Sequence, residues 1–244
     1  MTPQRTLATA GRVLSQVRHD PRTIVLLLVV PSLLIGLLAW IFSDTPVFAT
    51  IGPGMIALFP FIVMFLVTSI TTLRERRTGT LERLLSMPLG KGDLILGYTL
   101  AFGLLAVAQS AVAVGFAVWV CGLEISGSIL LLLAVAVADA VLGTSLGLLA
   151  SAFARTEFQV VQFMPALVFP QILLGGIFLP REQLPDVLRA ISDWLPLSHA
   201  IDALQAVAAD SQDAAYVGGE LLIIGAWIVG AVVLGSVTLR RRTP

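Results

Sequence analysis

The chain is 244 residues long, has a mean hydropathy of +0.95 and carries only 12% charged residues. Soluble domains carry about 25% charged residues, so this composition excludes a soluble globular protein and predicts a polytopic membrane protein. The formal net charge is zero, and the positions of the charges therefore say more than their sum. The single cysteine, Cys121, excludes an intrachain disulfide and a metal site built from cysteines.

The first 22 residues form a polar segment in which Leu7, Ala10, Leu14 and Val17 share one helical face. This pattern predicts an interfacial helix on the inner membrane surface rather than a secretory signal. Beyond it, six apolar segments are each long enough to cross a hydrocarbon layer of about 30 Å as a helix. They are residues 24–42, 51–72, 94–120, 129–153, 158–179 and 221–239. The sequence therefore predicts a single all-α membrane domain over residues 1–244, with six membrane spans.

The basic residues are divided unequally between the segments that connect these spans. Thirteen of the fifteen lie before the first span, in residues 73–92, after the fourth span or at the C-terminus. Only Arg181 and Arg189 lie on the other side. Because loops rich in Lys and Arg stay in the cytoplasm, both termini and residues 73–92 are predicted to be cytoplasmic. The expected location is the cytoplasmic membrane.

Residues 73–92, LRERRTGTLERLLSMPLGKG, form the longest strongly charged segment between two apolar runs. Within it, Leu81, Leu84 and Leu85 recur at helical spacing behind a Thr-Gly-Thr sequence. This spacing predicts a short amphipathic helix at the inner face of the membrane. The alternative is a solvated charged loop anchored by three leucines.

This segment resembles the loop between the second and third spans of type 2 ABC transporter permeases, and the chain is most similar to the daunorubicin-resistance type. The resemblance is carried by Arg74, Glu75, Gly79, Thr80, Leu81, Glu82, Leu84, Leu85 and Pro88. In that family the segment is a coupling helix that docks into a separate ABC ATPase subunit. The resemblance implies that the contact is made by Arg74, Glu75, Gly79, Thr80, Leu81, Glu82, Arg83, Leu84 and Leu85.

Residues 180–220 form the only long segment predicted on the outer side of the membrane. Apolar residues recur at helical spacing from Leu184 to Leu195, which predicts an amphipathic helix too short to span. Pro196 ends it, and a second short helix is expected to continue toward Ala209. Its residues Pro196, Leu197, Ser198, Ala200, Ala203 and Leu204 resemble the outer-leaflet helical hairpin before the last span of type 2 permeases. Such a hairpin either plugs the outer face of the bundle or takes part in substrate release.

Several chemical motifs can be weighed directly. The chain has no G-x-x-x-x-G-K-[ST] motif, so we expect no ATPase activity, cofactor or metal on it, with ATP and Mg²⁺ held by the separate subunit. Gly143 to Gly147 matches the G-x-S-x-G motif of hydrolases but lies inside an apolar helical run. The same glycines, extended by Ser151, match a small-residue pattern that predicts close helix packing. His19 and His199 are predicted on opposite sides of the membrane, which argues against a zinc site.

Asp139 is the one acid near the middle of a span. An unpaired carboxylate there costs about 2.5 kcal/mol or more on insertion scales, so it is expected to face the bundle interior or a wet cavity, or to be protonated and hydrogen-bonded. Gln109, Gln159, Gln162 and Gln171 are further candidates for lining a translocation path. For each glutamine, a hydrogen bond between helices is the alternative.

The resemblance implies an ATP-driven exporter in which two permease subunits, identical or paralogous, meet around a central pathway above two ATPase subunits. The expected substrate is hydrophobic, namely a drug, an antibiotic or a lipid. Membrane lipid is the other expected partner, and no nucleic acid is expected. A proton-coupled secondary carrier is the alternative, although the sequence shows neither a clear repeat nor a second acid in the middle of a span.

Overall fold

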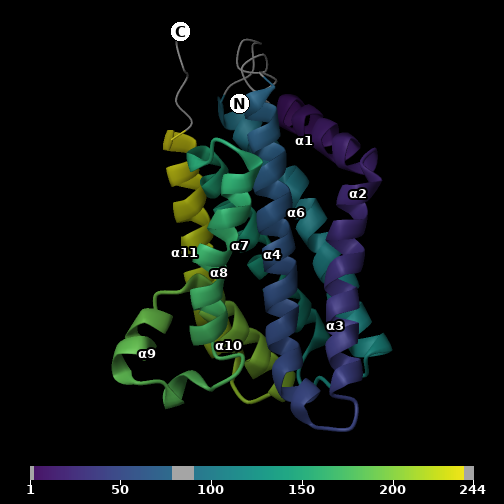
Figure 1. The fold of residues 1–244 in the computed structure, drawn as a ribbon, viewed down its shortest axis with the longest axis vertical. Coiled ribbons are helices and arrows are strands. Elements are labelled where there is room, and N and C mark those ends of the chain that lie inside the picture. The colour runs from purple at the N-terminus through teal and green to yellow at the C-terminus, as the bar shows by residue number, and fades with distance from the viewer. Residues whose placement is uncertain (1–2, 79–90, 239–244) are drawn as a thin grey trace.

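The computed structural model describes residues 3–78 and 91–238, and every regular element in these ranges is a helix (Figure 1). Six helical segments in the described ranges are long and apolar enough to cross a membrane. They are Pro21–Ile41, Val47–Arg77, Leu96–Val120, Ile129–Phe153, Glu157–Leu174 and Ala214–Gly235. The predicted all-α architecture with six spans is therefore confirmed, and the chain is a multi-pass membrane protein.

The helices follow one another with mostly short connections. Their bounds are α1 Pro3–Arg18, α2 Pro21–Ile24, η1 Val25–Val29, α3 Val30–Ile41, α4 Val47–Arg77, α6 Lys91–Gly115, η2 Phe116–Val120, α7 Ile129–Phe153, α8 Glu157–Leu174, η3 Arg181–Gln183, α9 Asp186–Ser192, α10 Pro196–Ala209 and α11 Ala214–Thr238. Two of these, η1 and η2, are single π-turns inside the first and third spans. Pro31 follows η1 and has no N–H to donate, which is a common local cause of a break in the α-helical ladder.

The two ends of the bundle differ in character. The N-terminus, α1 and the last turns of α4 lie at the upper end in Figure 1, whereas α9 and α10 lie at the lower end. We call the first the basic end, formed by α1, residues 74–77 and residues 151–157. The second is the hairpin end, formed by residues 175–213.

α4 is the central helix of the bundle. In its most apolar window 72% of the residues are buried, against 17% in α8 and in α11, and it contacts α3, α6, α7, α8 and α10. It begins at Val47, earlier than the predicted residue 51, because Phe48 already packs into the core. Gly52, near its start, allows the side chain of Leu123 to pack close to the helix backbone, since a Cβ atom at Gly52 would lie 2.8 Å from Leu123 Cδ1. The conformation of α4 therefore affects almost every other helix.

α1 packs along α6 instead of standing apart from the bundle. Its buried residues are Thr9, Ala10, Val13 and Val17. Gly97 of α6 lets the two helices approach closely, because a Cβ atom there would lie 2.6 Å from Thr9 Cβ. Leu7, which the prediction placed on the apolar face, is 60% exposed. A helix is thus present within residues 1–22, at Pro3–Arg18, and its buried face is covered by protein, while its position at the membrane interface stays a prediction.

The last two spans differ from their predicted bounds at the hairpin end. The fifth was predicted to reach residue 179, but α8 ends at Leu174 before a glycine pair in which Gly176 has a φ of +86°. The sixth was predicted to begin at residue 221, but α11 begins at Ala214, where Asp213 caps the first turn. The segment that connects them is therefore residues 175–213, which is shifted toward the N-terminus relative to the predicted 180–220 and is almost as long.

The two helices of the hairpin end are packed differently. The helix predicted from Leu184 to Leu195 is confined to α9, because Pro185 stands at its N-cap. Ser192 is its only buried residue, so the apolar face expected to pack stays exposed. By contrast α10, which begins with Pro196, is buried along most of its length and packs against α4 and α7. α10 therefore belongs to the core, and α9 lies on its edge.

Candidate functional site

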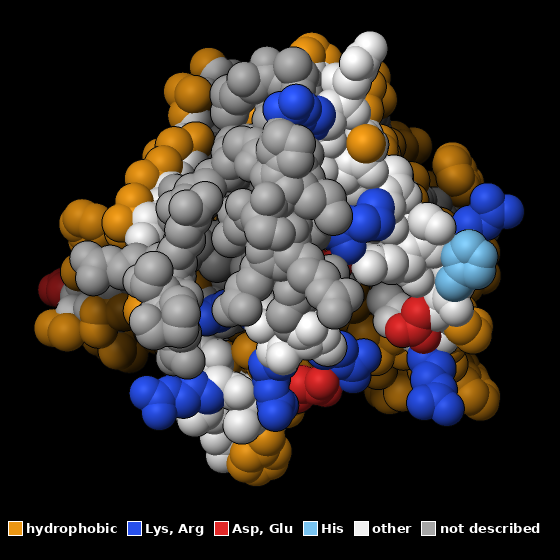
Figure 2. Space-filling model, turned by 90° about the horizontal axis from the view of Figure 1, so that it is seen from above, with side chains coloured by type: hydrophobic (Ala, Val, Ile, Leu, Met, Phe, Trp, Pro, Cys, Tyr) orange, Lys and Arg blue, Asp and Glu red, His pale blue; other side chains and the backbone are white. Residues whose placement is uncertain are grey.

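The residues predicted to meet an ATPase subunit begin in the last turn of α4 and continue beyond its end. Arg74 and Glu75 lie in its last turn, which ends at Arg77. The remaining predicted contact residues, Gly79, Thr80, Leu81, Glu82, Arg83, Leu84 and Leu85, lie outside the described residues. Basic side chains gather around this end of the molecule (Figure 2). The structure therefore shows the residues from which the predicted coupling segment starts, namely the last turn of α4. We call this turn and its contacts the root of the coupling segment.

Glu75 is held by α1 and turned toward the protein. Arg12 Nη1 donates to Glu75 Oε1 at 2.8 Å, and Arg12 Nη2 donates to the Tyr98 hydroxyl at 2.9 Å. The guanidinium carbon also lies 5.7 Å from the centre of the Tyr98 ring. In the amide orientation that satisfies both neighbours, Gln16 joins Arg12 and Glu75 at 3.0 Å each. Glu75 is only 7% exposed, and the described partners of its carboxylate lie on α1.

A second set of contacts ties the end of α4 to the turn between α7 and α8. Arg74 Nε and Nη2 donate to the two carboxylate oxygens of Glu157 at 2.8 and 3.0 Å. Arg76 donates from Nη1 to the backbone oxygen of Ser151. The Arg74 pair is solvent-exposed, and such pairs contribute at most about 1 kcal/mol, but its two-pronged geometry fixes direction. Helices from three parts of the chain thus meet at the root of the coupling segment.

The small-residue stripe of α7 lies against α4. A Cβ atom added to Gly143 would lie 2.5 Å from the backbone oxygen of Phe61, and one added to Gly147 would lie 2.5 Å from that of Phe65. Ser151 is buried one turn further along. Because α7 runs without a break from Ile129 to Phe153, the G-x-S-x-G sequence has no strand-to-helix turn to expose a nucleophile.

Asp139 and Gln109 are enclosed in the bundle. Asp139 is 0% exposed and Gln109 is 1% exposed. None of their four side-chain polar atoms has a hydrogen-bond partner among the described residues. Buried polar groups without partners are rare and each calls for an explanation. These two residues are the candidates for a polar function inside the bundle, whereas the other predicted pathway residues have different surroundings.

The three glutamines of α8 do not share one surface with Asp139. Gln159 Oε1 accepts the backbone N–H of Arg155 at 2.7 Å at the basic end. Gln171 Oε1 accepts the backbone N–H of Leu197 at 3.0 Å and so anchors the start of α10. Gln162 is exposed on the outside of α8. Two of the three glutamines therefore make hydrogen bonds that hold the chain together.

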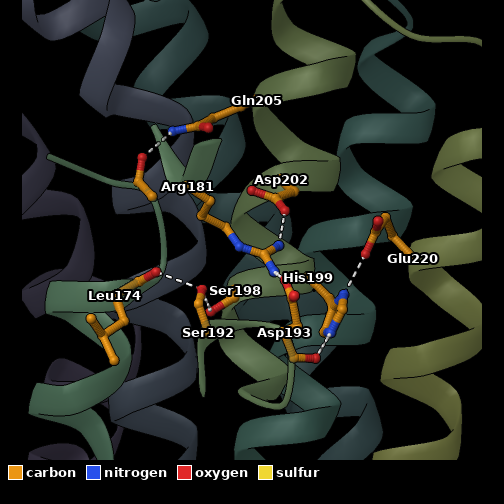
Figure 3. Close-up of polar contacts among 10 residues, drawn as sticks. Leu174, Arg181, Ser192, Asp193, Ser198, His199, Asp202, Gln205 and Glu220 are labelled. Atoms are coloured by element: carbon orange, nitrogen blue, oxygen red, sulfur yellow. Dashed lines mark hydrogen bonds and ion pairs between the residues drawn. The ribbon is translucent and has the colours of Figure 1, made fainter. Parts of the chain in front are cut away.

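Sequence reasoning missed an ionic cluster at the hairpin end (Figure 3). Arg181 donates to the carboxylates of Asp193 and Asp202, and His199 Nδ1 lies 2.6 Å from Glu220 Oε2. Arg181 comes from η3 and Asp193 from the turn that follows α9. His199 and Asp202 lie on α10, and Glu220 lies on α11. One signal was available in the sequence, since Glu220 is an acid that directly precedes a strongly apolar run. Its partner could not be named from spacing alone.

Two members of this cluster have shifted proton affinities. The hydrogen bond to Glu220 raises the pKa of His199 above its usual value. Burial raises the pKa of Asp202 to about 6, although the charge of Arg181 acts in the opposite direction. Groups with such shifts change charge close to neutral pH, where an ordinary aspartate does not.

Comparison with known proteins decides the family. Residues 4–208 match the family described as ABC-2 type transporter, which covers most of the chain. This protein belongs to the ABC-2 type transporter family. The ABC-2 match begins in α1 and ends in α10, so it includes the basic end, the coupling segment and the α4–α7 contact. The resemblance inferred from residues 73–92 is thereby confirmed at the level of the family.

Individual relatives of this ABC-2 chain are distant in sequence. It is 26% identical over 194 residues to the ABC transporter G family member 20 of Dictyostelium discoideum, which covers 79% of this chain. It is 29% identical over 150 residues to the probable multidrug ABC transporter permease YbhR of Escherichia coli and 26% identical over 156 residues to YbhS, covering 62% and 64% of this chain. The chain spans only 27% of the first relative's length and 41% of the other two.

Proposed function

We propose that this chain is the permease subunit of an ATP-driven exporter, with ATP hydrolysed by a separate subunit that docks at the basic end. The observation that carries the proposal is the arrangement at the root of the coupling segment. Arg12 ties Glu75 to α1, and Arg74 ties α4 to the start of α8. A displacement of residues 79–90 would therefore be transmitted to α1, α4 and α8 together.

The direction of the chain in the membrane follows from its two ends. Basic residues concentrate at the basic end, which supports a cytoplasmic position for it and for both termini in the cytoplasmic membrane. Trp40, Trp119 and Trp194 are 79%, 77% and 77% exposed and lie near the end of α3, in η2 and after α9. All three are close to the hairpin end, and tryptophan is enriched at membrane–water interfaces. This supports an outer-leaflet level for the hairpin end.

The mechanism requires that the coupling segment bind differently to the two states of the ATPase, since equal binding would transmit no work. In this proposal Leu81, Leu84 and Leu85 supply the apolar anchor, and nearby charges orient the contact. Glu75 contributes indirectly, because the described structure commits it to Arg12. Closure of the ATPases would then switch the pathway from facing inward to facing outward.

A second permease subunit is part of the proposal. Only 17% of the most apolar window of α8 is buried in this chain, and Gln162 is exposed on that helix. A polar side chain in a span is normally turned to a partner helix or a wet cavity. An α8 that faces a second permease subunit and the pathway between the two would provide either environment.

The proposed substrate is a hydrophobic compound, that is, a drug, an antibiotic or a lipid. A groove of about 440 Å³ lies between α7 and α11 and is lined by apolar residues, among them Leu146, Leu149, Trp227 and Leu234. The relatives YbhR and YbhS carry the description multidrug, which supports a drug-like substrate. The daunorubicin-resistance type remains the proposed subgroup, on the resemblance of the chain to permeases of that type.

Co-purification tests the proposal. The tagged protein, extracted in mild detergent, is expected to bring down an ATPase subunit in stoichiometric amount, and the complex is expected to hydrolyse ATP. A protein that purifies alone and moves solute in liposomes with a proton gradient but without ATP would establish a secondary carrier instead.

Replacing Leu84 and Leu85 together with aspartate is expected to leave membrane insertion intact and to uncouple ATP hydrolysis from transport. The reason is that two charges replace the apolar anchor at the proposed docking contact. Transport and ATPase activity are measured on the same reconstituted complex, with at least a tenfold loss of transport expected. Ser86→Asp is the matched control, because it adds a charge to the same segment and keeps both leucines. Unchanged transport in the double variant would remove the coupling role.

Asp139 distinguishes the exporter from the secondary carrier. Asp139→Asn keeps the size of the side chain and removes its ionisable group. Because neither carboxylate oxygen has a hydrogen-bond partner in the described part of the chain, we expect the variant to fold with stability changed by less than about 1.5 kcal/mol. In an ATP-driven exporter the pH dependence of transport should stay the same. A flattened pH profile of transport would show that Asp139 carries a proton and would favour the carrier.

A further inference from the structure

Among the described residues, α9 is attached to the rest of the protein by several polar contacts, and its apolar face is only partly covered. Its apolar residues Val187, Leu188 and Ile191 are 73%, 39% and 46% exposed. Its one buried residue, Ser192, donates to the backbone oxygen of Leu174 at 2.7 Å. The turn that follows α9 is held by Arg181 and His199 through Asp193. A helix held in this way docks with a free energy that depends on charge.

His199 makes the contact that depends most directly on a proton. Its Nδ1 lies 2.6 Å from Glu220 Oε2 on α11, and its Nε2 lies 3.0 Å from the backbone oxygen of Asp193 (Figure 3). A carboxylate and a carbonyl oxygen only accept hydrogen bonds. Both contacts are therefore hydrogen bonds at the same time only when both ring nitrogens carry a proton, that is, when the imidazole is charged. A neutral ring keeps one of them and places a lone pair against the other oxygen.

The other charged groups around His199 act in known directions. Arg181, from η3, pairs with Asp193 and with Asp202, which lies one turn after His199 on α10. Its positive charge opposes protonation of His199, but the hydrogen bond to Glu220 is larger and raises the pKa of His199 overall. Tyr216 lies on α11 close to Glu220 and carries no charge at neutral pH. Glu220 is thus the dominant partner of the imidazole.

We propose that protonated His199 holds the turn after α9 against α10 and α11, and that loss of its proton weakens this contact. We call this pH-dependent contact the clip. At acid pH on the hairpin side the charged ring makes both hydrogen bonds and α9 stays docked. At alkaline pH the neutral ring gives up the bond to Asp193, because the carboxylate of Glu220 holds the remaining proton. Docking is then weakened to the contacts of Ser192 and Arg181, and α9 leaves the bundle in a larger fraction of molecules. The clip does not depend on the proposed transport function, since it concerns one conformational equilibrium of this chain alone.

The sign of the pH effect follows from proton linkage. A histidine whose pKa is raised in the docked state stabilises that state fully below its ordinary pKa of about 6.5, and the contribution is lost as the pH rises through the raised pKa. Asp202, with a pKa of about 6 in the docked state, also takes up protons when it is buried. Both groups favour docking at acid pH, so their effects add.

Double electron–electron resonance, which measures the distance between two spin labels, tests the clip. The labels are placed on the purified protein in lipid nanodiscs at Val187→Cys and Gly219→Cys, after Cys121→Ser has removed the native thiol. Val187 is exposed, and a Cβ atom at Gly219 meets nothing within 4 Å, so both labels are tolerated. One narrow distance is expected at pH 5.5. At pH 8.5 longer distances are expected, with the docked-to-released ratio falling by up to about tenfold per pH unit between the two pKa values.

Two substitutions and one matched control make the result specific. His199→Gln cannot donate two hydrogen bonds in opposite directions and is expected to show the longer distances at both pH values. His199→Lys keeps a positive charge throughout and is expected to show the narrow distance at both. His19→Gln removes the other histidine, which is exposed, and should behave like the parent. A parent distribution that does not change with pH, or a pH shift that persists in His199→Gln, would overturn the clip.

Discussion

Replacing Gly147 with valine is expected to destabilise the protein by about 3 kcal/mol or more. A Cβ atom there would lie 2.5 Å from the backbone oxygen of Phe65 and 3.1 Å from its Cα atom. The obstacle is backbone in the middle of the central helix, so no side chain can rotate away and α7 must move from α4. Overpacking of a tight core costs about 1–3 kcal/mol where neighbours can adjust, and here they cannot.

Thermal unfolding in detergent, followed by size-exclusion chromatography, measures this effect. A loss of about 3 kcal/mol corresponds to roughly 10 °C in Tm for a chain of this size, if unfolding is treated as two-state. Gly225→Val is the matched control, because Gly225 also lies in a span but a Cβ atom there meets nothing within 4 Å. Equal Tm values for the two variants would show that α7 and α4 do not need this close approach.

Replacing Arg12 with methionine is expected to cost about 3 kcal/mol of stability. The change leaves Glu75, whose side chain is 9% exposed, without its cation and removes one hydrogen bond from Tyr98. Breaking a buried pair by removing one partner costs about 3–5 kcal/mol, because the other charge stays buried and uncompensated. We expect the lower part of this range, since the Arg12 side chain is 28% exposed and water screens part of the interaction.

The double variant Arg12→Met with Glu75→Leu separates charge pairing from packing. Removing both charges leaves no uncompensated carboxylate, so most of the lost stability should return. Arg18→Met on the same helix serves as the control, because Arg18 is exposed. The same thermal assay applies to all four proteins. If the double variant were as unstable as Arg12→Met, the contribution of Arg12 would come from packing against Tyr98.

The spans and the helix contact at the glycine stripe show how far local sequence reaches. Six apolar runs of sufficient length predict six helices, because backbone polar groups have no other partners in a bilayer. Gly143 and Gly147 lie four residues apart and so share one helical face, which identifies a face that can approach another backbone. The sequence could not say that this backbone is α4 at Phe61 and Phe65, since both helices are apolar around most of their surface.

The charged residues show where such reasoning stops. Glu75 lies in a segment that resembles a docking element. Only the packing of α1 reveals that the carboxylate of Glu75 is paired with Arg12. The exposed face of α9 had the spacing of a packed helix, but the helix runs only from Asp186 to Ser192 and buries Ser192 alone. His199 and Glu220 are 21 residues apart, and no local pattern links them.

The sequence by itself determined that this is a membrane protein, how many times it spans the membrane and to which family it belongs. These properties depend on run length, composition and short local motifs, which are independent of how distant segments meet. Only the tertiary structure decided which charges are paired. Arg12 and Glu75 lie on helices that are far apart in the chain, and His199 and Glu220, although on consecutive helices, meet only because α10 packs against α11. Contacts of this kind depend on how the helices pack, and sequences with the same hydrophobic pattern can pack their helices in different arrangements.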